Sequence, residues 1–182
     1  MSNLKSQYPE IFPTILQHLK LKLALFAVYL LPLFFFIKPW TQYLFFILGG
    51  LLGIGLLVAD ELFLNRFYNE TDELELESSQ EPLTSQSSNP TFLATRSTLF
   101  LITLLPLAFF VVTSTGSWLG IGLIMGLLFG LLHEMWQLRG NPRHFNQRFW
   151  GQVKTELQEE KINLVLIFSI CYFLFLNLFF LR

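Results

Sequence analysis

Hydrophobic residues form five long runs, separated by short polar turns or by charged segments. The runs cover about residues 21–37, 41–59, 97–112, 118–132 and 162–181. A run of about 20 apolar residues can cross the hydrocarbon core of a bilayer as an α-helix. The pattern therefore predicts an all-α integral membrane protein with five transmembrane helices.

The first and third runs share nearly the same stretch. Residues 25–37 read LFAVYLLPLFFFI and residues 99–111 read LFLITLLPLAFFV, so eight of thirteen aligned positions are identical. The similarity continues along the second and fourth runs if one residue is dropped in the turn. We predict two repeated hairpins plus one C-terminal span, with short interfacial helices, the first of them within residues 1–20. Because both copies enter the membrane in the same direction, their axis should run along the membrane normal.

Charged and turn-forming segments divide the chain into five parts. Residues 1–68 hold the interfacial N-terminus and the first hairpin, and residues 69–96 form an acidic, serine-rich segment. Too few apolar residues are present there to form a core, so we expect a flexible cytoplasmic loop. The second hairpin covers residues 97–140, and residues 141–161 are predicted to form an amphipathic interfacial helix, because apolar residues recur every four positions. Residues 162–182 form the fifth span.

Basic residues favour one orientation. With the N-terminus inside, ten Lys and Arg residues lie on the inner side and two on the outer side. The inner residues are Lys5, Lys20, Lys22, Arg66, Arg96, Arg139, Arg143, Arg148, Lys154 and Lys161, and the outer ones are Lys38 and Arg182. Membrane proteins carry their excess of Lys and Arg in cytoplasmic segments. We therefore predict a bacterial plasma-membrane protein with a cytoplasmic N-terminus and an external C-terminus.

Glycines recur at four-residue spacing in the second and fourth runs. They are Gly49 and Gly53 in the second run and Gly122, Gly126 and Gly130 in the fourth. Residues four apart lie on one side of a helix, and small residues allow two helices to approach closely in lipid. We expect the glycine face of the fourth run to pack against the second run.

The first and third runs each contain a proline, Pro32 and Pro106. A proline inside a helix removes one backbone hydrogen bond and crowds the carbonyl four residues earlier. We expect a kink at each position. The alternative is a hinge, or an exposed carbonyl that coordinates an ion.

Charged residues gather at the predicted inner ends of the second and fourth spans. We call this set the polar collar: Asp60, Glu61, Arg66, His133, Glu134 and Arg139. Within one helix, Glu61 and Arg66 are five residues apart, which is outside the favourable pairing distances. We therefore expect pairs across the two hairpins, Glu61 with Arg139 and Glu134 with Arg66.

The polar collar also contains groups that could bind a metal or carry a proton. Histidine and carboxylates are common metal ligands. However, His133-Glu134 is not followed by the second histidine of an H-E-x-x-H motif, because Gln137 occupies that position. A zinc protease is therefore disfavoured, and we assign no metal site.

Composition and motifs limit the classes of function. The chain is 53% hydrophobic and 14% charged, whereas soluble domains carry about 25% charged residues. The sequence contains no P-loop, dinucleotide fingerprint, serine elbow or cysteine cluster. We assign no catalytic residue and no cofactor, and we expect no nucleic-acid partner.

Three functions fit this pattern. We favour a non-catalytic scaffold or accessory subunit of a membrane complex, which contacts the lipid bilayer and either a membrane-protein partner or a second copy of itself. The first alternative is a transporter or channel that works as an oligomer. The second alternative is a membrane enzyme that uses the inner-face Asp, Glu and His groups.

Overall fold

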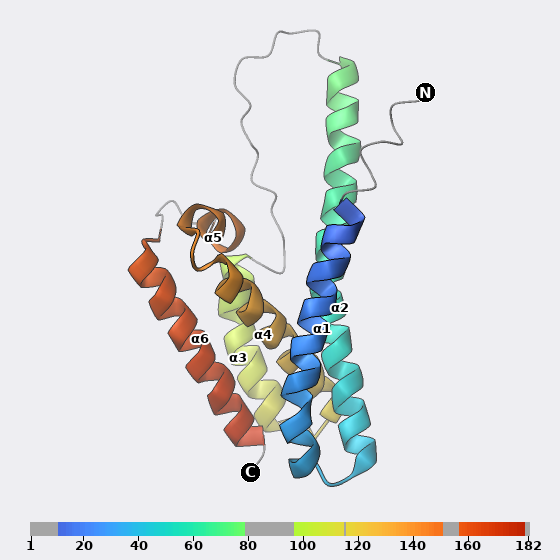
Figure 1. Cartoon of the computed structure of the whole chain (residues 1–182), viewed down its shortest axis with the longest axis vertical. Helices are drawn as coiled ribbons and strands as arrows, with labels where there is room; N and C mark the ends of the chain where they lie inside the picture. The colour runs from blue at the N-terminus through green and yellow to red at the C-terminus, as the bar shows by residue number, and fades with distance from the viewer. Residues whose placement is uncertain (1–10, 79–96, 115, 151–156, 181–182) are drawn as a thin grey trace.

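A computed structural model describes residues 11–78, 97–114, 116–150 and 157–180; for residues 11–18 and 61–78 it describes the backbone alone. Within these ranges the chain forms helices and no strands (Figure 1). In chain order the helices are α1 (Ile11–Phe36), α2 (Trp40–Ser78), α3 (Thr98–Ser114), α4 (Trp118–Leu138), α5 (Pro142–Phe149) and α6 (Glu159–Phe180).

Four of the described helices contain segments long and apolar enough to cross a membrane. These segments are Leu19–Phe36 of α1, Trp40–Asp60 of α2, Trp118–Leu138 of α4 and Glu159–Phe180 of α6. The outward-facing side chains are apolar as well, including Phe35 on α1, Leu99 on α3 and Leu178 on α6. Such a surface requires hydrocarbon around it rather than water. The protein is therefore an all-helical, multi-pass membrane protein.

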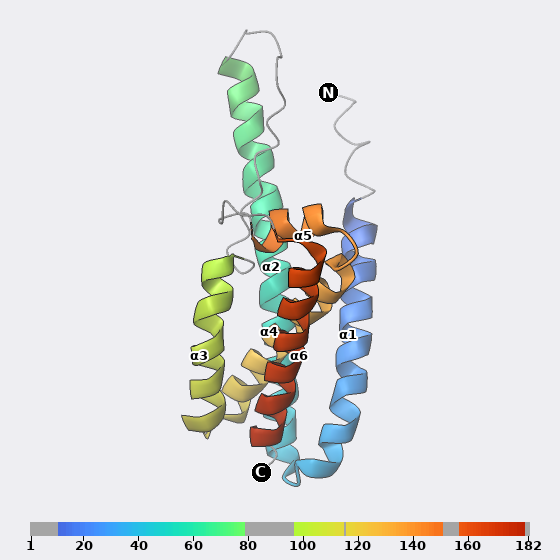
Figure 2. The ribbon, with the colours of Figure 1, turned by 90° about the vertical axis from the view of Figure 1, so that its left-hand side faces the viewer.

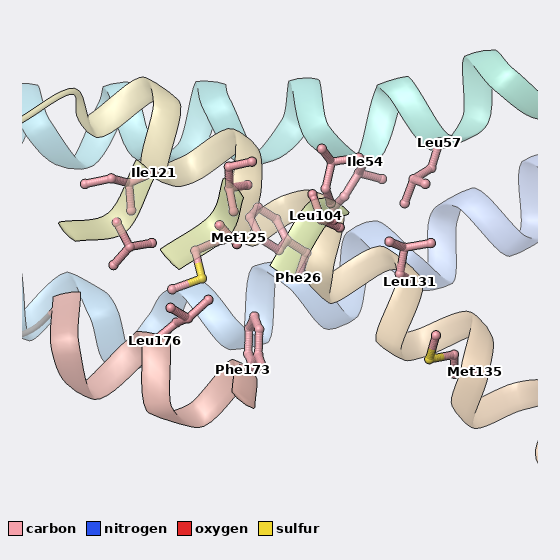
Figure 3. Close-up of a cluster of buried hydrophobic side chains, with 14 of the residues drawn as sticks. Phe26, Ile54, Leu57, Leu104, Ile121, Met125, Leu131, Met135, Phe173 and Leu176 are labelled. Carbon is pink, nitrogen blue, oxygen red and sulfur yellow. The ribbon is translucent and has the colours of Figure 1, made fainter. Parts of the chain in front are cut away.

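Helix α4 lies at the centre of the bundle and contacts α1, α2, α3, α5 and α6. It begins where the Ser117 hydroxyl accepts a hydrogen bond from the backbone N–H of Gly120, which satisfies one of the free donors of the first turn. Figure 3 shows side chains of its neighbours packed against it, among them Phe26 of α1, Leu104 of α3 and Phe173 of α6.

The closest helix contact joins α2 to α4 through glycines. A Cβ atom added to Gly53 would lie 2.3 Å from the carbonyl oxygen of Leu123, and one added to Gly126 would lie 2.2 Å from the carbonyl oxygen of Gly50. Gly49 and Gly122 meet the opposite backbone in the same way, and Gly130 faces the Leu57 side chain. The glycine face of α4 therefore lies against α2, and the absence of side chains allows the close approach.

Both prolines lie inside continuous helices. Pro32 is within α1 and Pro106 is within α3. Both residues are exposed on the outer surface of the bundle, so neither ring occupies a helix contact.

Three predicted boundaries are wrong. A separate surface helix within residues 1–20 was expected, but from Ile11 onward the chain belongs to the same helix as the first span; residues 1–10 lie outside the described part. Pro13 does not interrupt α1 because it lies in its first turn, where no intrahelical N–H bond is needed. The helix also continues through Lys22, where the sequence changes from polar to apolar. Lys22 lies on the inner face of α1 and is paired with Glu134 of α4.

The second wrong boundary is the start of the acidic loop at residue 69. Helix α2 continues to Ser78, so the first ten residues of the segment 69–96 are helical. Glutamate and leucine dominate residues 73–77, and both have high helix propensity. Residues 79–96 lie outside the described part, so the flexible loop predicted there stays a prediction.

The third is the amphipathic helix predicted for residues 141–161. Helix α5 ends at Phe149, and Leu157 lies before the start of α6. The Asn146 side chain bonds to both backbone groups of Leu157, at 3.0 Å each. In one continuous helix, these two residues would be about 16 Å apart. A single helix over residues 141–161 is therefore wrong: α5 covers Pro142–Phe149, and Glu159–Lys161 already belong to α6. The interfacial position of α5 stays a prediction.

Candidate functional site

The candidate site is a buried group of charges where α1, α4 and α5 meet. Its centre is Glu134, which follows Leu127 and Leu131 on the buried face of α4. Glutamate at this position is 4% exposed. A carboxylate removed from water in this way requires a charged or hydrogen-bonding partner.

Lys22 supplies that partner from α1. The buried face of α1 contains Lys22, Phe26, Leu30 and Leu33, at the three- and four-residue spacing of one helix face. Lys22 is 5% exposed, and its Nζ donates a hydrogen bond to Oε1 of Glu134. This ion pair joins two helices, and its two residues are 112 positions apart in the sequence.

Arg148 approaches the second carboxylate oxygen from α5. Its Nε lies 3.7 Å from Oε2 of Glu134, and its side chain is 32% exposed. Lys22, Glu134 and Arg148 therefore form one ionic group, which we call the inner ion cluster. Arg148 is the member of this cluster that reaches the molecular surface, because the other two side chains are almost fully buried.

Helix α5 is held in place by two buried phenylalanines and by a hydrogen bond at its C-terminal end. Pro142 occupies the start of the helix, where the missing N–H is not needed. Phe145 and Phe149 are each 1% exposed. The Thr98 hydroxyl at the start of α3 donates to the Phe149 carbonyl at 2.8 Å. These contacts fix the position from which Arg148 reaches Glu134.

The structure describes the side chains of four of the six members of the polar collar. Glu134 is at the centre of the inner ion cluster, and Asp60 and His133 are half-buried. The His133 Nε2 lies 3.5 Å from the Gln137 Nε2, one turn along α4. Arg139 is exposed and its guanidinium lies over the Trp136 ring, 4.1 Å from the ring centre.

The two remaining members, Glu61 and Arg66, have no described side chains. The pairs expected between Glu61 and Arg139 and between Glu134 and Arg66 therefore stay predictions. What the structure does show is that Glu134 pairs with Lys22 on the first helix of the other predicted hairpin.

Sequence reasoning missed Lys22 and Arg148. The charge pattern places Lys22 only among the residues that set orientation, although it lies four residues before Phe26 and so extends the apolar face of α1. That register was a usable signal. Arg148 carried no such signal, because its approach to Glu134 depends on how α5 folds back over the end of the bundle.

The chemistry of the inner ion cluster follows from its burial. Opposite charges interact strongly when water is excluded, but removing one partner leaves a buried charge without compensation. Among the residues that the structure describes, no three His, Cys, Asp or Glu side chains are grouped so that they could hold a metal ion. The cluster joins α1 and α5 to α4 through the two oxygens of one carboxylate.

A second polar contact lies deeper in the bundle. The Tyr29 hydroxyl donates to Oδ1 of Asn177 at 2.5 Å, and Nδ2 of Asn177 donates to the Phe173 carbonyl at 2.8 Å. The Tyr29 ring stacks on Phe129 of α4. This contact ties α1 to α6 within the span, where interhelical hydrogen bonds stabilise the packing of helices.

Comparison of the chain with protein-family models, with curated proteins and with solved structures finds no match.

Proposed function

We propose that the protein is a scaffold or accessory subunit of a membrane complex. The observation that carries this proposal is the length of α2, which has 39 residues, of which the membrane-spanning segment takes Trp40–Asp60. Residues 61–78 continue the same helix, and Figures 1 and 2 show this part, in green, projecting beyond the ends of α1 and α5. At 1.5 Å per residue, it extends about 27 Å past the span. We call residues 61–78 the arm.

The sequence of the arm indicates the chemistry of its partner. It contains six acidic residues and one basic residue, Arg66. A helix with an excess of acidic residues attracts a positively charged surface and favours one orientation of the partner. We infer a protein partner with a basic surface on the cytoplasmic side. The inner ion cluster supports this non-catalytic function, because its charges are engaged with one another.

The proposal includes a topology of five spans. Helix α3 has 17 residues, all but Thr98, Thr103, Thr113 and Ser114 apolar, and it contacts α4 and α6. A helix of this length reaches about 26 Å, which is the lower end of what a span requires. With five spans and the basic residues inside, the N-terminus and the arm are cytoplasmic and the C-terminus is external. A bacterial plasma membrane fits this distribution.

The contacts between α2 and α4 support an internal repeat. Gly49 approaches the Leu119 carbonyl as Gly122 approaches the Phe46 carbonyl, at 2.1 and 2.2 Å for an added Cβ. Gly53 and Gly126 make a second such pair of contacts. In each case, a shift of 73 residues converts one contact into the other. This is the relation expected for two hairpins that dock around a twofold axis.

The orientation is checked by reporters of cellular compartment. A reporter fused after residue 80 or after Gly151 should be cytoplasmic, whereas one fused at Arg182 should be external, because an odd number of spans separates the termini. Enzymatic reporters that are active on only one side of the membrane provide the measurement. A cytoplasmic reporter at Arg182 would contradict either the fifth span or the orientation.

The scaffold function is tested by capturing complexes from the native membrane. We expect chemical crosslinking, purification of the full chain and mass spectrometry to identify a partner in stoichiometric amount. Changing Glu70, Asp72, Glu73, Glu75 and Glu77 to their amides should release it. Glu159→Gln with Glu160→Gln is the control, since it removes exposed acidic residues from α6 instead. A chain that purifies alone, or a partner that the arm variant retains, would contradict the proposal.

A further inference from the structure

An apolar pocket of about 160 Å³ lies between α3, α4 and α6. Leucine, isoleucine, valine, methionine and aromatic side chains make up nearly all of its lining, with Thr98, Ser169 and Tyr172 as the polar residues. The hydroxyls of these residues donate to the carbonyls of Phe149, Val165 and Leu105, respectively. Because backbone groups already engage the hydroxyls, the pocket is suited to a hydrocarbon ligand.

The pocket faces the hydrocarbon of the membrane. Apart from Trp150, its lining residues belong to the spanning segments of α4 and α6 and to the apolar helix α3. Ile102 and Phe168, which also line it, are 59% and 57% exposed on the outer surface. A pocket open to the bilayer at this depth is accessible to the acyl chain of a neighbouring lipid.

A cationic segment lies at the inner end of the same three helices. Trp150 lines the pocket and directly follows α5, and both views show α5 crossing the end of the bundle near α3, α4 and α6 (Figures 1 and 2). Residues 139–150 contain three arginines and one histidine but no acidic residue. Arg139 and Arg143 are exposed, as expected for side chains that meet lipid headgroups.

We propose that this pocket holds an acyl chain of an anionic phospholipid whose phosphate lies against the cationic segment 139–150. The apolar lining selects the chain, and the exposed Arg139 and Arg143 select the negative headgroup, since basic residues at a membrane surface attract anionic lipids. A tryptophan at the junction matches the preference of indole rings for the interface. The proposal concerns a different part of the molecule from the arm and does not depend on the scaffold function.

Native mass spectrometry of the full chain tests it. The protein is purified in detergent with equal amounts of phosphatidylglycerol and phosphatidylcholine that have identical acyl chains. We expect one retained lipid, with phosphatidylglycerol preferred, and about a fivefold weaker preference in Arg143→Gln. Ser169→Leu, which fills the pocket, should lose the lipid. Cys171→Leu is the matched control, because Cys171 is exposed on the same helix and does not line the pocket.

A second measurement keeps the test decisive if Ser169→Leu does not fold. In a variant with Trp40, Trp118 and Trp136 changed to phenylalanine, Trp150 is the remaining tryptophan. Brominated phosphatidylglycerol should quench its fluorescence more strongly than phosphatidylcholine with the same brominated chains. Equal quenching by the two lipids, equal retention of the two headgroups, or equal lipid retention by Ser169→Leu and Cys171→Leu would each overturn the proposal.

Discussion

Replacing Gly126 by leucine is expected to lower the free energy of unfolding of the bundle by about 3 kcal/mol, at the upper end of the usual effect of overpacking. A Cβ atom at this position would lie 2.2 Å from the carbonyl oxygen of Gly50 and 2.7 Å from its Cα. Both atoms belong to the backbone of α2, so no side-chain rotation can relieve the clash. Reversible unfolding in mixed micelles, followed by circular dichroism, measures the change.

Gly55→Leu is the matched control on the partner helix. Among the described residues, no heavy atom beyond its own neighbours lies within 4 Å of an added Cβ at Gly55. Gly55→Leu should leave the free energy of unfolding unchanged or raise it slightly, because leucine has a higher helix propensity than glycine. Equal losses at Gly55 and Gly126 would contradict the contact between α2 and α4 as the cause of the destabilisation, because only Gly126 faces the other helix.

Lys22→Met is expected to destabilise the protein by about 3–5 kcal/mol, the usual effect of removing one partner from a buried ion pair. Methionine keeps the apolar length of the side chain but cannot donate a hydrogen bond to Glu134. The carboxylate would then lose its closest cation. The same unfolding assay measures the loss.

Lys20→Met provides the comparison for Lys22. Lys20 lies two residues earlier on α1 and is exposed, so its replacement should change the free energy of unfolding by no more than about 0.5 kcal/mol. Similar losses of stability in the two variants would mean that the total positive charge of α1, rather than the position of Lys22, determines the stability. That result would contradict the inner ion cluster.

Several features of the fold follow from sequence pattern alone. The long apolar runs predict helices that cross a membrane, because bilayer thickness fixes the length that a span requires. The four-residue spacing of Gly122 and Gly126 indicates a flat helix face, and the structure places that face against α2. These signals are local, so one sequence is enough to read them.

Other features depend on distant contacts or on competing local signals. Glu134 was recognised as a candidate from its place at the end of a span, but its partner Lys22 is 112 residues away and belongs to another helix. The length of α2 was underestimated because acidic, serine-rich composition suggested a loop, whereas glutamate and leucine also favour a helix. The sequence does not mark the end of α5, because the four-residue apolar repeat continues beyond Phe149, where the helix ends. The bonds between Asn146 and Leu157 that exclude one continuous helix are tertiary contacts.

Glu134 pairs with Lys22 and so fixes α1 to α4. A double-mutant cycle with Lys22→Met and Glu134→Gln, measured by reversible unfolding, tests it most directly. We expect the double variant to lose less stability than the sum of the two single losses, with a coupling of about 1–3 kcal/mol. The parallel cycle with Lys20→Met and Glu134→Gln should be additive to within about 0.5 kcal/mol. Strictly additive losses for Lys22 and Glu134 would contradict the claim.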